Sequence, residues 1–235
     1  MPNVRAHVRG TNRLLQLLPE KDRKRVLSNT EHRVQAHRDE VFQRYSAIKN
    51  VHFPLDGVVS LIIEMKDGAS AEVGVVGNEG MAGLPLLTGS NGGPVEAFYQ
   101  VPGQSLCMTA RAFKKEIARR GSFEQILQRY SQVFFNQVAQ STACNRLHEV
   151  HQRLCRWLLM CHDRVGGPEI NLTQEFLAQM LGVRRSSVNT AASALQKLGL
   201  IRYRRGLIQI LNRPAIEAKS CECYAVVLAD YERMN

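Results

Sequence analysis

The chain has 235 residues, of which 44% are hydrophobic and 22% are charged. This composition is that of a globular protein whose core needs no disulfide staples. No apolar run approaches the roughly 20 residues of a membrane-spanning helix, and the first residues lack the apolar core of a signal peptide. We therefore expect a cytoplasmic protein with no membrane partner, whose six cysteines are reduced.

The net charge of +10 is unevenly distributed along the chain. It is +6 over residues 1–50, −5 over 51–110, +4 over 111–150 and +5 over 151–235. The run 182–213 contains no acidic residue. Its basic residues are Arg184, Arg185, Lys197, Arg202, Arg204, Arg205 and Arg213. Clustering of one sign favours a polyanionic partner, and we favour nucleic acid over acidic lipid.

A basic helical segment at residues 12–18 is followed by a region of short strands, from about residue 40 to 110. The β-branched and aromatic segments 58–63, 71–76 and 95–101 are separated by turns rich in Gly, Asn and Asp. Such closely spaced strands predict a compact antiparallel barrel or sandwich.

The residues after Thr109 predict a long amphipathic helix. Its apolar stripe comprises Phe123, Ile126, Leu127, Tyr130, Val133, Phe134, Gln137, Val138, Ser141, Cys144 and Leu147. Because this stripe exceeds what a small β domain needs, we expect the helix to pair with a second copy; an ordinary core helix is the alternative. A second helix is predicted at 150–164, before the stop signal Gly166-Gly167-Pro168, with a domain boundary at 146–150.

Residues 171–188 have the pattern of a helix-turn-helix. Thr173 can cap the first helix, and Gly182 supplies the positive φ of the turn. The second helix begins with side chains that can reach base edges and phosphates in the major groove, so it is the predicted recognition helix. These side chains are Arg184, Arg185, Ser186, Ser187, Asn189 and Thr190. We expect Arg185 to contact guanine and Asn189 to contact adenine.

The residues that follow predict a β-hairpin at 202–210, with Arg204, Arg205 and Gly206 at its tip. Such a wing would lie along the sugar-phosphate backbone. Asn212 then predicts the cap of another helix, in which Pro214 occupies a tolerated first-turn position.

This order of parts resembles the cyclic-AMP-receptor/fumarate-nitrate-regulator (Crp/Fnr) family, most closely over residues 152–210. The resemblance implies an α+β fold with an N-terminal β-roll, a jelly roll of the cyclic-nucleotide-binding type, at 1–120. It further implies a dimerisation helix and hinge at 121–149 and a winged helix-turn-helix at 150–235. The expected partners are double-stranded DNA with a two-fold operator, a second copy of the chain, and RNA polymerase if the protein is an activator.

The resemblance also implies roles for individual residues. Thr173 and Gln174 would contact phosphates, while Arg185, Ser186 and Thr190 occupy the base-reading positions. Glu is usual in the family where Ser186 stands, and Arg is common at Thr190, so the operator sequence is left open.

The expected effector pocket comprises Gly80, Met81, Gly83 and Val95. Members of the family that bind cyclic nucleotides present a carboxylate where Met81 stands and an Arg for the phosphate. Lys66 is the one cationic residue between positions 51 and 110. We therefore do not expect cyclic AMP as the effector, although another small ligand is compatible with the roll.

Metal, redox and enzymatic alternatives receive less support from the sequence. His148, His151 and Cys155 share a helical face, and Cys221 and Cys223 are close in sequence, but we expect packed structural residues, no metal and no cofactor. The first cysteine is Cys107, which argues against the N-terminal iron-sulfur cluster of one family branch. No catalytic motif is present, so we expect no enzyme; the alternative function is a small-ligand-binding signalling protein without specific DNA binding.

Overall fold

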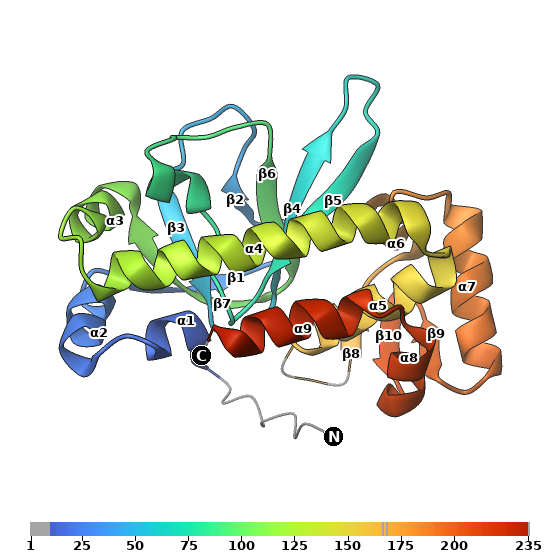
Figure 1. Ribbon diagram of the computed structural model, residues 1–235. Helices are drawn as coiled ribbons and strands as arrows, with labels where there is room; N and C mark the ends of the chain where they lie inside the picture. The colour runs from blue at the N-terminus through green and yellow to red at the C-terminus, as the bar shows by residue number, and fades with distance from the viewer. Residues whose placement is uncertain (1–9, 166, 168, 235) are drawn as a thin grey trace.

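The computed structural model describes residues 10–165, 167 and 169–234 (Figure 1). The helices are α1 (Arg13–Gln16), α2 (Glu20–Leu27), α3 (Ala110–Ile117), α4 (Ser122–Leu147), α5 (Val150–His162), α6 (Gln174–Leu181), α7 (Arg185–Lys197), α8 (Arg213–Lys219), α9 (Cys223–Arg233) and the 3₁₀ turn η1 (Leu84–Thr88). The strands are β1 (Glu31–Gln35), β2 (Glu40–Phe42), β3 (Asn50–Pro54), β4 (Val58–Glu64), β5 (Ser70–Val76), β6 (Glu96–Val101), β7 (Gly103–Thr109), β8 (Glu169–Asn171), β9 (Ile201–Arg204) and β10 (Leu207–Ile210). No helix in these ranges is both long and apolar enough to pass through a membrane.

The first seven strands form two antiparallel sheets, ordered β1-β7-β3 and β2-β6-β4-β5. The three strands predicted from the sequence are confirmed as β4, β5 and β6. Strand β1 begins before the predicted strand region. Four of its five residues are exposed, so it lacks the apolar alternation from which a strand is recognised. The α+β class and the N-terminal β-roll are confirmed.

Helix α4 runs along the β-roll and buries much of its apolar stripe inside the same chain. Phe123, Ile126, Leu127 and Tyr130 are all 3% exposed or less. The Tyr130 hydroxyl donates to the Met81 carbonyl oxygen at 3.1 Å. Most of the stripe that the sequence assigns to a partner helix is therefore filled by the roll, as in an ordinary core helix.

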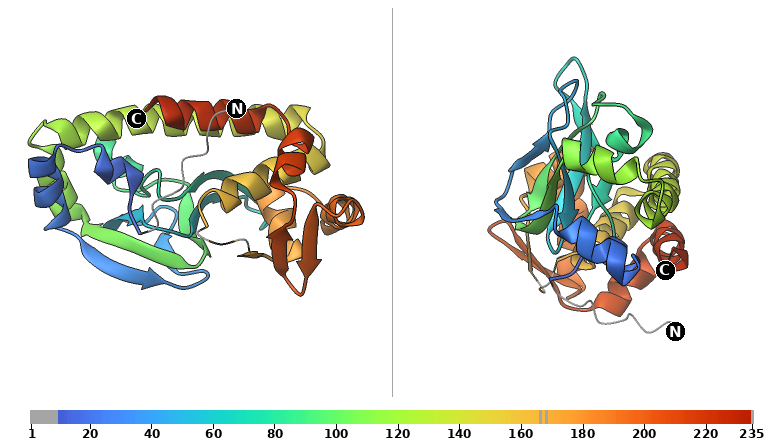
Figure 2. Two further views of the ribbon diagram at one scale, coloured as in Figure 1. Left: turned by 90° about the horizontal axis from the view of Figure 1, so that it is seen from below. Right: turned by 90° about the vertical axis from the view of Figure 1, so that its left-hand side faces the viewer.

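Helix α9 lies alongside α4, as Figures 1 and 2 show from different directions. The amide of Asn136 donates to the Asp230 carboxylate at 3.1 Å, and Val227 and Tyr231 are buried in the contact. The last helix of the chain therefore packs on the long helix rather than completing the helix-turn-helix.

Helix α5 begins with a capping box in which Glu149 and Gln152 bond reciprocally to each other's backbone N–H groups. It ends at His162; of the predicted stop signal, Gly166 and Pro168 lie outside the described residues. Every residue from 153 to 161 is buried. This apolar helix is the centre on which the C-terminal elements pack.

The C-terminal part packs directly against the β-roll through α6. The Gln179 amide donates to the Ser70 hydroxyl at 2.6 Å, and the ring of Phe176 meets the ring of Phe98 with centroids 6.2 Å apart. These contacts fix how α6, and hence α7, is held relative to the roll.

Candidate nucleic-acid interface

The two helices of the helix-turn-helix are positioned by a side-chain cap and a glycine turn. The Thr173 hydroxyl accepts a hydrogen bond from the Phe176 N–H at 3.2 Å, which satisfies one open donor of the first turn of α6. Gly182 ends α6 with φ of 60°, as the sequence predicted. Val188 and Leu195 are buried, so the opposite face of α7 points outward.

The predicted DNA-contacting side chains lie together at this end of the molecule. Thr173, Arg184, Arg185, Ser186, Asn189, Thr190, Arg204 and Arg205 are exposed, whereas Gln174 and Ser187 are half-buried. The amide of Gln174 donates to the side-chain oxygen of Asn189 at 3.1 Å, which ties the first turn of α6 to α7. Asn189 would therefore meet a partner with its side-chain oxygen already hydrogen-bonded.

The wing is a tight hairpin beside the helix-turn-helix. Strands β9 and β10 pair antiparallel, and Arg205 and Gly206 between them have φ of 51° and 79°, the signs of a type I′ turn. A Cβ placed on Gly206 would lie 3.7 Å from the methyl group of Thr173. The wing tip and the first turn of α6 therefore belong to one surface.

Tyr203 is a positioning residue that the sequence analysis did not single out. Its hydroxyl donates to the Leu172 carbonyl oxygen at 2.8 Å, and its N–H donates to the Gln196 side chain at 2.8 Å. It thus joins the wing both to the segment before α6 and to α7. A tyrosine within a predicted strand gives no sequence signal for this role.

The charges on this surface are free to act on a partner. None of the ion pairs among the described residues involves Arg184, Arg185, Arg204 or Arg205. Arg213, the last basic residue of the acid-free run, instead pairs with Asp163 at 2.6 Å and with Glu217. The basic surface therefore ends at the wing.

The residues of the expected effector pocket lie elsewhere, and three of the four are buried. A Cβ on Gly80 would overlap the Tyr130 hydroxyl, and one on Gly83 would come within 2.8 Å of Val51. Met81 is 0% exposed. Val95, which is half-buried, precedes β6.

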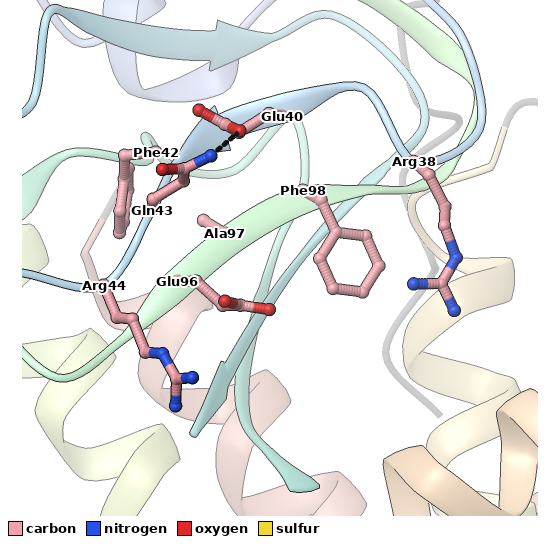
Figure 3. A pocket seen from close by; sticks show the side chains of 8 residues that line it. All are labelled: Arg38, Glu40, Phe42, Gln43, Arg44, Glu96, Ala97 and Phe98. Carbon is pink, nitrogen blue, oxygen red and sulfur yellow. Dashed lines mark hydrogen bonds between the residues drawn. The ribbon is translucent and has the colours of Figure 1, made fainter. Parts of the chain in front are cut away.

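A pocket of about 400 Å³ opens on a different part of the roll, along β2 and β6 (Figure 3). It is lined by Arg38, Glu40, Phe42, Gln43, Arg44, Glu96, Ala97 and Phe98. The guanidinium of Arg38 lies over Phe98 and also over Phe176 of α6, at 5.5 and 5.9 Å from the ring centroids. The pocket therefore touches the junction between the roll and the helix-turn-helix, and none of the residues expected from the sequence lines it.

Glu72 is a second link across this junction. Trp157 of α5 donates its indole N–H to one carboxylate oxygen of Glu72 at 2.8 Å, and Ser60 donates to the other at 2.5 Å. Burial raises the pKa of Glu72 to about 7, although these hydrogen bonds oppose the shift. The interface therefore contains a carboxyl group that titrates near neutrality.

Comparison with known proteins identifies the type of domain that contains the helix-turn-helix. Residues 152–219 match the family model of the Crp-like helix-turn-helix domain. No curated protein sequence matches the chain.

Several solved structures are similar to the chain in fold. A candidate transcriptional regulator of the Crp/Fnr family from Eubacterium rectale is 17% identical with a TM-score of 0.66, covering 88% of this chain and 96% of its own. The c-di-GMP-responsive global regulator CLP of Xanthomonas campestris is 17% identical with a TM-score of 0.63, covering 82% and 99%. A Crp-family transcriptional regulator from Thermus thermophilus is 18% identical with a TM-score of 0.66, covering 80% and 96%.

The domain match and the shared fold agree with the exposed helix-turn-helix and its wing. Residues 152–219 thus match a Crp-like helix-turn-helix domain, and the chain as a whole shares the fold of solved Crp/Fnr-family regulators.

Proposed function

We propose that the protein binds a two-fold operator in double-stranded DNA as a homodimer and regulates transcription by binding, not by catalysis. The observation that carries this proposal is the continuous, acid-free surface of α7 and the wing, with four exposed arginines that lack an ion-pair partner among the described residues. Its partner DNA places the protein in the cytoplasm. If it is an activator, RNA polymerase is a further partner.

The side chains divide by position into base-reading and phosphate-binding groups. Arg185, Ser186 and Thr190 lie in the first turns of α7, the part of a recognition helix that meets base edges. Thr173 and Gln174 at the start of α6, with Arg204 and Arg205 on the wing, are suited to phosphates. Arg184, Ser187 and Asn189 complete the proposed contact surface.

The exposed face of α4 supports the proposed dimer. Gln132, Phe135, Ala139 and Thr142 follow one another at alternating spacings of three and four residues, which is the seam of a coiled coil. Phe135 is 65% exposed although it is large and apolar. A dimer through this seam would have to place the two recognition helices about 34 Å apart to enter successive major grooves.

We propose the division 1–120, 121–149 and 150–235 for the roll, the dimer helix with its hinge, and the DNA-binding part. Control by an effector in the roll is part of the proposal, and we do not propose cyclic AMP as that effector, because the buried, apolar Met81 stands where members of the Crp/Fnr family that bind cyclic nucleotides present a carboxylate. The pocket at Arg38 supports a small-ligand-binding signalling protein as the second candidate, because it contacts α6. Isothermal titration with cyclic AMP, cyclic GMP and cyclic di-GMP tests these ligands directly.

The decisive experiment is selection of bound DNA from random oligonucleotides with the wild type, Arg185→Ala and Arg111→Ala. Arg111 is exposed in α3, far from the proposed surface, so its variant is matched in charge. We expect an inverted repeat, and we expect Arg185→Ala to relax one symmetric pair of positions at a cost of about 1–3 kcal/mol. Weak, sequence-blind binding by the wild type would reject the proposal and favour the ligand-binding alternative.

A further inference from the structure

Four metal-binding side chains that are far apart in the sequence meet at the end of α4. Cys144 lies in the last turn of α4, and His148 is the residue that caps this helix, with its N–H bonded to the Cys144 carbonyl oxygen. Cys221 lies between α8 and α9, and Cys223 is the first residue of α9. One ligand atom from each of the four lies within 4.8 Å of the others.

We propose that Cys144, His148, Cys221 and Cys223 bind a zinc ion that fastens the C-terminal helix α9 to the long helix α4. The proposal does not rest on the proposed function, because it concerns only how these two helices are held together.

The distances within the cluster fit a tetrahedral metal site. The sulfur atoms of Cys144 and Cys221 are 3.5 Å apart, and the sulfur of Cys223 is 3.5 Å from Nδ1 of His148. Bonds of about 2.3 Å from zinc to sulfur and about 2.0 Å to nitrogen, at tetrahedral angles, separate the ligand atoms by roughly 3.5–3.8 Å. A disulfide would need the sulfurs about 2.05 Å apart and would use only two of the four groups.

The neighbours of the ligands orient them as in known metal sites. Nε2 of His148 lies 3.2 Å from a carboxylate oxygen of Glu222, so this nitrogen can carry the proton and leave Nδ1 free for the metal. The Gln140 amide donates to the sulfur of Cys223 at 3.0 Å. Hydrogen bonds of this kind fix the ligand positions and stabilise a thiolate.

Two buried cations beside the cluster lack a negatively charged partner among the described residues. Arg153 and Arg156 of α5 are 7% and 6% exposed, and their charges act on the thiols of the cluster. Neither guanidinium is in an ion pair with a carboxylate of the described chain. Three thiolates and one neutral imidazole around a divalent zinc carry a net charge of −1, which offsets these cations, whereas neutral thiols do not.

The chemistry of the ligands selects the metal and its role. Thiolate and imidazole favour zinc over magnesium and calcium, which prefer oxygen ligands. All four positions are filled by the protein, and the three cysteines are at most 3% exposed, as in structural sites that leave no place for a substrate. The ion would stand beside the α4–α5 joint at residues 147–150, which connects the long helix to the DNA-binding domain (Figure 1).

Helical spacing in the sequence groups His148 with His151 and Cys155 instead. The structure separates them, because His151 is half exposed and pairs with Glu149 at 3.2 Å, and Cys155 is buried in the main core. The expectation of no metal considered His148, Cys221 and Cys223 but not Cys144, and local spacing could not show that these four residues meet.

The test is metal analysis of the full-length chain, purified without a polyhistidine tag. We expect about one zinc per chain in the wild type and almost none in Cys144→Ala or Cys223→Ala. Cys107→Ala is the matched control, since Cys107 is a buried cysteine of β7 outside the cluster, and it should retain the metal. His148→Cys should also retain it, since four thiolates form an equally good zinc site.

A second measurement on the wild type avoids variants that fail to fold. After removal of metal with a chelator, added cobalt should give thiolate charge-transfer bands and the strong visible bands of tetrahedral Co²⁺, and zinc should abolish them. Sub-stoichiometric zinc together with octahedral cobalt spectra would overturn the proposal. A Cys144–Cys221 disulfide in the metal-free protein as isolated would overturn it too, in favour of a redox pair.

Discussion

At the scale of single residues, Arg164 shows how one buried charge joins several elements. Its guanidinium pairs with Glu79 of the roll at 2.8 Å and donates to the Met160 carbonyl oxygen at 2.7 Å. Both members of the ion pair are 7% exposed. A Cβ on Gly77 would overlap the Arg164 side chain, so this glycine is required by close approach.

Removing one partner of this pair should be costly. Glu79→Gln leaves the guanidinium buried without its counter-charge, so we expect the free energy of unfolding to fall by about 3 kcal/mol, measured by urea denaturation. The control is Glu20→Gln, which breaks the exposed pair with Lys24 and should cost less than about 0.5 kcal/mol. Equal losses in the two variants would show that the buried pair has no special role.

At the residue scale, a substitution in the wing can also distinguish a phosphate contact from a base contact. Arg205→Ala removes one exposed charge from the hairpin tip. We expect weaker binding to all DNA sequences alike. The slope of the logarithm of the binding constant against the logarithm of salt concentration should become shallower by about 1, measured by fluorescence anisotropy at several salt concentrations. A change in sequence preference with an unchanged salt slope would place Arg205 against a base instead.

At the scale of elements, α4 has three faces with different neighbours. One face packs on the roll and a second on α9, which leaves the seam of Gln132, Phe135, Ala139 and Thr142 exposed. The apolar periodicity in the sequence identified the face toward the roll, because that face is the most hydrophobic. The exposed seam is more polar, so the same signal could not reveal it.

Phe135→Ala tests this seam as the dimer contact. Because the side chain is exposed in the single chain, its loss should leave the fold unchanged but weaken dimerisation by about 2 kcal/mol, measured by sedimentation equilibrium. Tyr45→Ala, at an 80% exposed tyrosine of the roll, should leave the dimer unaffected. An unchanged dimer constant in Phe135→Ala would place the interface elsewhere.

At the scale of the whole molecule, the roll and the DNA-binding domain are held together by polar contacts that include a titratable one. Glu72 accepts hydrogen bonds from Ser60 of the roll and from Trp157 of α5. Its pKa of about 7 in the folded chain lies above the ordinary value of 4.5. Between these values the folded chain keeps a proton that the unfolded chain releases.

The folded state should therefore lose stability as the pH rises, because burial disfavours the ionised carboxylate. The contribution of Glu72, up to about 3 kcal/mol, is fully present below pH 4.5 and is lost as the pH rises through 7. Trp157 is the one tryptophan of the chain, so its fluorescence should titrate with a midpoint near 7. Glu64→Gln, at the exposed pair with Arg44, should keep this midpoint, whereas Glu72→Gln should abolish it. A titration that persists in Glu72→Gln would assign it to another group.

The sequence by itself determined the parts whose signals are local. Thr173 as a cap, Gly182 at a positive φ, the strands β4 to β6 and the wing with its turn at Gly206 each depend on residues within one or two turns of the chain. Backbone preference and apolar periodicity act over that same short range, so the helix-turn-helix and a compact antiparallel β domain could be predicted, whereas the β-roll came from the family resemblance.

Only the tertiary structure decided which side chains meet across the chain. Cys144 and Cys221 are 77 residues apart, and Trp157 and Glu72 are 85 apart. These contacts exist because α9 packs on α4 and because α5 and α6 pack on the roll, and no local pattern encodes such packing. The same packing pairs Arg213 with Asp163 and buries Met81 of the expected effector pocket.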